Sequence, residues 1–202
     1  MAISQGSPEW LEQRRGKVTA SRIADIMAKT KSGYSTSRQN YLMQLLCERL
    51  TDKVEESYKS PAMQRGNDLE AEARNWYQLE TGKLVEEISF VDHPSIHNAG
   101  ASPDGLVGTD GLIEIKCPNT ATHIDTLRTK KPADKYYKQM QWQMACTGRQ
   151  WCDFVSFDNR LPDNLAYCCI RIERNNEFIT EIEQEVNAFL LELSEIEEEL
   201  LK

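Results

Sequence analysis

The sequence predicts a mixed α/β fold, in which helices lie on both sides of a central sheet. Three observations support this prediction. The chain has 202 residues, 40% of them hydrophobic and 28% charged, which is the profile of a globular protein that buries a core. Apolar residues recur at helical spacing up to Gly82, and the period then changes to that of strands. The length suits one domain, and we expect a single domain over residues 1–202.

Four helices are expected before Gly82. Ser7-Pro8-Glu9 has the pattern of an N-cap, a first-turn proline and an acid near the positive helix end, so a helix should begin there and stop at Gly16. The Ser-, Thr- and Lys-rich residues 29–38 are expected to be a loop. The other three helices are one that Thr19 or Ser21 caps and that turns Ile23, Ile26 and Met27 inward, one over residues 38–52, and one from Pro61 to Glu80.

The rest of the chain should supply the sheet and one long terminal helix. Five strands are expected, over about residues 87–92, 99–107, 112–117, 152–158 and 166–172. One helix, over about residues 133–147, separates the third strand from the fourth. Asp110-Gly111 is a strong hairpin-turn pair, so the second and third strands should be antiparallel. The final helix carries one apolar stripe, formed by Ile182, Val186, Phe189, Leu193, Ile196 and Leu200. We expect it to pack as a lid on the chain's own core, with a partner helix or coiled coil as the alternative.

The charge of the chain is unevenly distributed. The net charge is −8, and residues 171–202 alone contain ten Glu against three basic residues. Residues 1–40 contain seven basic residues against three acids, and residues 124–138 contain five against two. An acidic chain is not expected to coat nucleic acid non-specifically, but this distribution permits a local basic channel.

Several classes of protein are excluded by what the sequence lacks. No apolar run approaches the ~18 residues of a membrane span, and the N-terminus has no apolar signal stretch, so we expect no membrane association and a cytoplasmic location. The six cysteines form no C-x2-C pair, and Cys168 and Cys169 are adjacent, which fits neither a zinc knuckle nor an iron–sulfur cluster. Reduced, mostly buried thiols are expected. His93, His97 and His123 are too scattered for a zinc site and are expected in exposed loops.

Charged side chains converge at the predicted hairpin. Because side chains alternate along a strand, Glu114 and Lys116 share one face, and the hairpin can bring Asp104 across to it. Asp104, Glu114 and the carbonyl of Ile115 offer hard oxygen ligands that suit Mg²⁺ or Mn²⁺. Lys116 could then orient or deprotonate an attacking water and stabilise charge on a phosphate, which predicts phosphodiester hydrolysis. The alternative is an ordinary surface Glu–Lys ladder beside a turn.

The wider pattern favours the nuclease interpretation. ASPDGL at residues 101–106 followed by EIKCP at residues 114–118 resembles the PD-(D/E)-x-K nuclease superfamily, and in particular the lambda-exonuclease-like alkaline exonucleases of phage recombination, the YqaJ-type viral recombinase group. The resemblance runs from about Trp10 to the C-terminal helix. It implies a restriction-endonuclease-like fold, with Asp104 and Glu114 as metal ligands and Lys116 as the catalytic lysine.

The resemblance also implies a reaction and its partners. The reaction is 5′→3′ digestion of one strand of linear double-stranded DNA, which leaves a 3′ overhang for recombination by single-strand annealing. The expected partners are two further copies of the chain in a ring-shaped homotrimer and a single-strand annealing protein. The chain would be phage- or prophage-encoded and act in the bacterial cytoplasm.

Two further residues are candidates for the active site. Glu70 shares a helical stripe with Gly66, Ala73 and Tyr77, so its carboxylate faces inward and either supports the metal site or pairs with a buried basic residue. Gln139, which shares a helix face with Gln143, matches the family's active-site glutamine and is expected to hold water or substrate phosphate.

Trp10-x3-Arg14 followed by Val18-Thr19-Ala20-Ser21 resembles the family's phosphate-holding segment, which implies that a third group of residues binds the 5′-phosphate. Arg14 offers a bidentate fork, and Ser21 lies with Thr19 at a helix start, where free N–H groups favour an anion. Ser102 adds a hydroxyl beside the catalytic loop. The family has a further arginine after EIKCP, where this chain has Asn119 to His123; His123 and Arg128 are the candidates to replace it.

Three other functions remain open at this point. They are a structure-specific or restriction-type endonuclease of the same fold, an iron–sulfur nuclease of that fold, and a catalytically inactive module that binds DNA ends. EIKCP together with the Trp10–Arg14 segment favours the exonuclease, and the cysteine spacing argues against the iron–sulfur nuclease. The intact set of Asp104, Glu114 and Lys116 argues against the inactive module.

Overall fold

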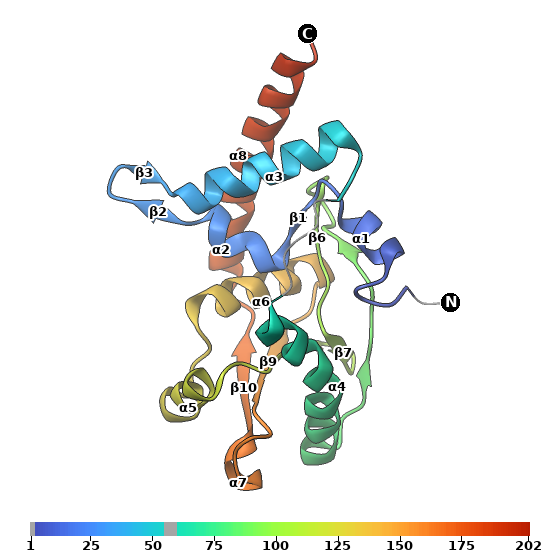
Figure 1. Ribbon diagram of the computed structural model, residues 1–202, viewed down its shortest axis with the longest axis vertical. Coiled ribbons are helices and arrows are strands. Elements are labelled where there is room, and N and C mark those ends of the chain that lie inside the picture. The colour runs from blue at the N-terminus through green and yellow to red at the C-terminus, as the bar shows by residue number, and fades with distance from the viewer. Residues whose placement is uncertain (1–2, 55–59) are drawn as a thin grey trace.

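A five-stranded mixed sheet forms the centre of the protein. The computed structural model describes residues 3–54 and 60–202 (Figure 1). The strand order is β10-β9-β8-β7-β4, and only the central β8–β9 pair is parallel. Its strands are β4 (Val85–Glu86), β7 (Gly105–Val107), β8 (Gly111–Lys116), β9 (Trp151–Phe157) and β10 (Tyr167–Glu173). The predicted mixed sheet is confirmed, as is the antiparallel hairpin of β7 and β8 around Asp110-Gly111.

A smaller sheet lies beside the central one and was not foreseen. It contains β1 (Val18–Thr19), β6 (Ala99–Ala101) and β5 (Val91–Asp92), with β1 parallel to β6. The expected strand over 99–107 is therefore divided, because residues 102–104 leave the small sheet at β6 and enter the central sheet at β7. The expected strand over 87–92 is also shorter than predicted, because only Val91–Asp92 form a strand, β5 of the small sheet, whereas β4 of the central sheet precedes this range. Part of the expected loop 29–38 is a hairpin of β2 (Lys29–Thr30) and β3 (Gly33–Tyr34).

The predicted helices are present, but two further helices were not predicted and one predicted N-cap was wrong. They are α1 (Pro8–Arg14), the 3-10 turn η1 (Ala20–Arg22), α2 (Ile23–Ile26), α3 (Thr36–Thr51), α4 (Pro61–Thr81), α5 (Thr120–Thr129), α6 (Asp134–Thr147), α7 (Asp163–Ala166) and α8 (Asn176–Leu200). Ser7 caps α1 as predicted, accepting from Trp10 N at 3.2 Å. Thr19 precedes η1, but its side chain makes no capping hydrogen bond. The prediction of one helix between β8 and β9 was wrong, because α5 precedes α6, and α7 was also missed.

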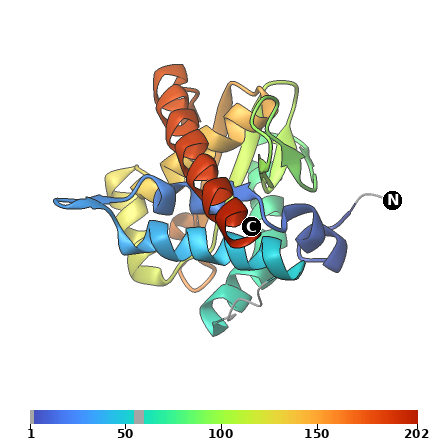
Figure 2. The same cartoon turned by 90° about the horizontal axis from the view of Figure 1, so that it is seen from above.

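Helices cover both faces of the central sheet, as the alternation along β8 requires. Leu112 belongs to a core with α2, α3, α6 and α8, whereas Ile113 and Ile115 belong to a core with α4 and α7. Figure 2 shows α8 lying across α3. Its predicted stripe is buried from Ile182 to Leu193, as the lid interpretation requires, whereas Leu200 at the end of the stripe is exposed.

The remaining expectations concern cysteines, histidines and membranes. All six cysteines are free. His97 is exposed as expected, but His93 and His123 are buried, so the prediction of three exposed loop histidines was wrong. Within residues 3–54 and 60–202, no helix is both long enough and apolar enough to cross a membrane.

Candidate active site

Asp104 takes the place of a missing strand residue. β7 begins at Gly105, opposite Ile113, and the Asp104 Oδ2 atom accepts the N–H of Ile115 at 2.6 Å. The carboxylate thus continues the hydrogen-bond ladder where the strand ends. In a strand, the N–H and C=O of one residue point to the same side, so the carbonyl of Ile115 faces the side on which Asp104 lies. Two of the predicted metal-ligand oxygens, from the Asp104 carboxylate and the Ile115 carbonyl, are therefore brought together.

Glu114 is fully buried, and three donors hold its carboxylate. It lies on the face of β8 that α6 covers, and it shares this face with Lys116 as predicted. Gln139 Nε2 donates to Oε1 at 2.6 Å, and Gln143 Nε2 donates to Oε2 at 2.6 Å. The ammonium group of Lys116 forms an ion pair with Oε1. Among the residues that the structure describes, the buried Oε1 atom of Gln143 itself has no hydrogen-bond partner. Gln139 therefore contacts the Glu114 carboxylate directly. Gln143 makes a second contact that was not predicted, although its spacing of four residues from Gln139 already placed the two side chains on one helix face.

Glu70 lies at the edge of this group on α4. It forms an ion pair with Arg74, 2.7 Å between Arg74 Nη2 and Glu70 Oε1, so the alternative role of pairing with a basic residue is part of its environment. Burial raises the pKa of Glu70, Arg74 and Lys116 oppose this, and the nearby charge of Glu114 adds to it. Glu70 is therefore electrostatically linked to Glu114 and Lys116.

The site as a whole has an excess of negative charge. Burial raises the pKa of Asp104 well above its ordinary value, and repulsion by Glu114 and Glu70 adds to this, against the attraction of Lys116. Burial lowers the pKa of Lys116, but Glu114 and Asp104 outweigh burial and leave it raised. Three carboxylates with two neighbouring cations are the environment that a divalent cation would neutralise.

The oxygen ligands present suit a Mg²⁺ ion that keeps several waters better than a metal ion held entirely by protein side chains. Among the residues that the structure describes, no three or more Asp, Glu, His or Cys side chains are grouped as metal ligands. Mg²⁺ usually keeps several waters and binds through one or two carboxylates together with substrate phosphates. Asp104, Glu114 and the carbonyl of Ile115 can supply that limited set.

A second group of polar side chains lies beside Asp104. Trp10 Nε1 donates to Ser102 Oγ at 2.9 Å, and Arg14 Nη1 approaches the same hydroxyl at 3.4 Å. The guanidinium of Arg14 lies over the Trp10 ring, 3.9 Å from its centroid, and burial lowers the pKa of Arg14. Arg14 and Ser102 are therefore brought together as predicted, and Trp10 is what aligns them.

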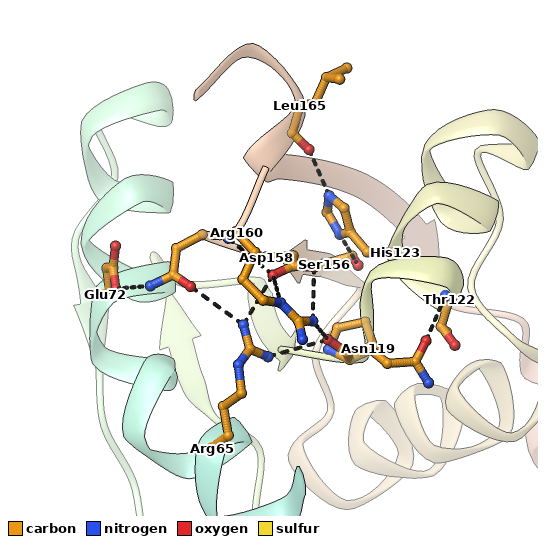
Figure 3. Close-up of polar contacts among 11 residues, drawn as sticks. Arg65, Glu72, Asn119, Thr122, His123, Ser156, Asp158, Arg160 and Leu165 are labelled. Carbon is orange, nitrogen blue, oxygen red and sulfur yellow. Dashed lines mark hydrogen bonds and ion pairs between the residues drawn. The ribbon is translucent and has the colours of Figure 1, made fainter. Parts of the chain in front are cut away.

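The other expected phosphate ligands differ in their surroundings. Ser21 is exposed on η1, whereas Thr19 is buried and its N–H donates to Tyr41 Oη at 3.1 Å. Arg128 is exposed on α5. His123 is fully buried, with Nδ1 2.7 Å from Ser156 Oγ and Nε2 2.8 Å from the carbonyl of Leu165 (Figure 3). Both ring nitrogens of His123 are thus occupied inside the fold, so the expectation that it binds phosphate was wrong.

Comparisons with known proteins identify the family and the fold of the chain. A family model for the YqaJ-like viral recombinase domain matches residues 9–150. The chain is 58% identical to an alkaline exonuclease, LHK-Exo, from Laribacter hongkongensis, with a TM-score of 0.91 over 96% of each chain. A crystal structure of LHK-Exo in complex with dAMP matches at 59% identity with the same TM-score and the same coverage. A phage-related exonuclease from Haemophilus somnus 129PT shares the fold, at 19% identity and a TM-score of 0.74 over 91% of this chain and 96% of the other. No match was found among curated proteins.

Proposed function

The chain belongs to the YqaJ-like viral recombinase family, and from this premise we propose that it is a Mg²⁺-dependent exonuclease that digests one strand of linear double-stranded DNA in the 5′→3′ direction. The whole chain would act as one exonuclease domain, with a restriction-endonuclease-like fold. The observation that carries the proposal is that two groups of side chains lie close together. One group is Asp104, Glu114 and Lys116. The other is Arg14 with Ser102, and Ser102 is only two residues before Asp104.

The first group would perform the hydrolysis. Asp104, Glu114 and the carbonyl of Ile115 would hold Mg²⁺ or Mn²⁺. The bound ion would lower the pKa of its water and polarise the phosphoryl group. Lys116 would orient or deprotonate the attacking water and stabilise charge on the phosphate. Gln139 would keep the Glu114 carboxylate in place, and Glu70 would support the site from its edge.

The second group would select the end of the strand. Arg14 provides a fork for a terminal phosphate, Ser102 provides a hydroxyl, and Ser21 with the Thr19 segment completes the proposed pocket, with Arg128 as the further candidate. Binding of the 5′-phosphate next to the catalytic residues would fix the polarity. A deoxynucleoside monophosphate is the product of such a step, and the complex of LHK-Exo with dAMP supports this choice of product.

Assembly into a homotrimeric ring around DNA remains part of the proposal, but the segments expected to line the channel of the ring are revised. Five of the seven basic residues in residues 1–40 form ion pairs within the chain; they are Arg15, Lys17, Arg22, Lys29 and Arg38. Among the five basic residues of residues 124–138, Lys138 pairs with Asp134. The segment 124–138 is therefore the better candidate for the inner wall. A single-strand annealing protein, a phage or prophage origin and the bacterial cytoplasm complete the proposal.

Digestion of linear duplex DNA tests the function. We expect release of mononucleotides from 5′-phosphorylated ends in Mg²⁺, a growing 3′ overhang, and no release in EDTA until Mg²⁺ or Mn²⁺ is restored. Glu114→Gln is the control for contaminating nuclease, because it should still bind DNA while losing about 10²–10³ in rate. Cleavage of closed circular duplex would instead indicate an endonuclease, and binding without any release would indicate an inactive end-binding module.

A further inference from the structure

A second cluster of charged side chains lies beyond Lys116, at the carboxyl ends of the parallel strands β8 and β9 (Figure 3). Asp158 directly follows β9 and is fully buried. Arg65 from α4 donates to Asp158 Oδ1 at 3.0 Å, and Arg160 donates to the two carboxylate oxygens at 2.7 and 2.9 Å. We call Arg65 and Arg160 the arginine pair. Open α/β sheets bind their ligands at this end of parallel strands.

The arginine pair carries more positive charge than Asp158 offsets. Burial raises the pKa of Asp158, but hydrogen bonds from Arg160 and Thr120 outweigh it and leave the pKa lowered, so the carboxylate is ionised. One carboxylate then faces two guanidinium groups. Glu72 joins the cluster through Asn159 Nδ2, at 3.1 Å, and not through either arginine. At Asp158 itself two guanidinium groups therefore face one carboxylate, and Glu72, one hydrogen bond further out through Asn159, is the second acid of the cluster.

The surplus charge is accessible to a ligand. The side chains of Arg65 and Arg160 are 28% and 47% exposed. Both also contact the carbonyl of Pro118, at 3.4 and 3.2 Å, which places them beside the first turn of α5. Asn119 caps that helix by accepting from Thr122 N at 2.9 Å, and the N–H groups before it have no intrahelical acceptor. Two partly exposed guanidinium groups beside a helix N-terminus are surroundings that favour a phosphate group.

The cluster and the Arg14–Ser102 group lie on different sides of the catalytic residues. Pro118 follows Lys116 and Ser102 precedes Asp104, so on these antiparallel strands both segments leave the open end of the β7–β8 hairpin, but different helices hold the two groups. Figures 1 and 2 both show α1, which carries Arg14, on one side of the molecule and α5 on the other. We propose that the arginine pair binds a backbone phosphate of the DNA substrate, across the catalytic residues from the bound 5′ end. This inference rests on the proposed exonuclease function.

The salt dependence of DNA binding tests the proposal. Arg65→Gln and Arg160→Gln each leave Asp158 paired with the other arginine, so both variants should fold. Arg171→Gln is the matched control, because Arg171 is 40% exposed and forks onto the buried Asp153 at 2.8 and 2.9 Å in β9 and β10. Affinity for a short 5′-phosphorylated duplex is measured in EDTA across a salt series. Removing one arginine–phosphate interaction should reduce the slope of log K against log salt by about 0.7–0.9.

The expected result separates the arginine pair from the control. Arg160→Gln and Arg65→Gln should weaken binding by about tenfold and lower the slope, Arg160→Lys should restore the slope, and Arg171→Gln should match the wild type. Neutral methylphosphonate linkages are then placed in either the digested or the complementary strand. In the strand that the arginine pair contacts, they should make the wild type bind as weakly as Arg160→Gln. In the other strand, Arg160→Gln should still bind more weakly than the wild type. Slopes equal to the wild type for both variants would overturn the proposal. A wild-type protein that neither binds nor digests duplex DNA would instead refute the exonuclease function.

Discussion

Gln143 is expected to set the rate of catalysis rather than the stability of the fold. The perturbation is Gln143→Met, which keeps the length of the side chain and removes its hydrogen bonds. The Glu114 carboxylate then loses one of its three donors, a charge-assisted bond of 2.6 Å inside the core. Such a bond contributes about 1.5–3 kcal/mol. If the loss falls on the orientation of Glu114, turnover should drop about 10–100-fold.

Stability should change much less, because two effects of the same substitution oppose each other. The lost bond destabilises the buried carboxylate, but the variant also removes the Oε1 atom of Gln143, which is buried without a partner in the described part of the chain. An unpaired buried acceptor costs about 1–3 kcal/mol. The free energy of unfolding should therefore stay within about 1 kcal/mol of the wild type.

Gln141→Met is the matched control on the same helix. Gln141 is also fully buried, but it donates to the carbonyl of Glu173 at 2.8 Å and accepts from Asn175 N at 2.9 Å, which ties β10 to α8. Its loss leaves two backbone groups unpaired, so the free energy of unfolding should fall by about 3 kcal/mol with turnover within about twofold of the wild type.

Single-turnover digestion gives the turnover of each variant, and denaturant unfolding gives its free energy of unfolding. The half-saturating Mg²⁺ concentration should also rise in Gln143→Met, since groups that orient a metal ligand affect metal affinity. Wild-type turnover in Gln143→Met would refute the reasoning. So would an equal loss of turnover in both variants.

Three further predictions concern the end of the strand, acid stability and assembly. Arg14→Ala should slow digestion of 5′-phosphorylated ends far more than of 5′-hydroxyl ends, because the fork needs the terminal dianion; equal slowing would assign Arg14 to folding or to general backbone binding. Asp158→Asn should lower the free energy of unfolding by about 2 kcal/mol at pH 7. Since the pKa of Asp158 is lowered in the folded protein, this difference should shrink below about pH 4 as the carboxylate is protonated, and a constant difference from pH 7 to pH 3 would contradict the assignment. Light scattering at micromolar concentration should give about three times 23.2 kDa, and a monomer would exclude the ring.

Local patterns predicted those parts of the fold that local physics decides. The Ser7 cap, the hairpin at Asp110-Gly111 and the alternation along residues 111–116 each depend on neighbours in sequence, and each was confirmed. The same alternation placed Glu114 and Lys116 on one face.

Features that depend on distant partners could not be predicted in this way. α5 has no apolar stripe, because its inward residues are His123 and Thr126, and His123 is held by Ser156 and Leu165 from other elements. The division of residues 99–107 between two sheets likewise depends on pairing partners, Val18 in one sheet and Ile113 in the other.

In the candidate site, sequence patterns supplied the residues but not all of their contacts. Asp104, Glu114 and Lys116 were placed together by strand geometry and by family resemblance. Their hydrogen-bonding partners depend on how α6 packs on the sheet, which is why the role of Gln143 and the pairing of Asp104 with the N–H of Ile115 emerged only from the structure. The pairing of surface charges also depends on the fold, because basic residues of the N-terminal segment such as Lys29 and Arg38 pair with Glu185 and Glu192 of α8.

The short connection from β6 to β7 has a consequence for the step size of the proposed enzyme. Ser102 would contact the terminal phosphate and Asp104 would act at the bond being cut, and only Pro103 separates them. Two residues of chain span at most about 7 Å, so the distance from strand end to cleavage point is limited by covalent geometry. Pro103 restricts that span further by fixing its own φ. The short segment from Ser102 to Asp104 would then fix the distance between the bound phosphate and the bond that is cut. Each cycle would therefore remove one nucleotide, whatever the base sequence.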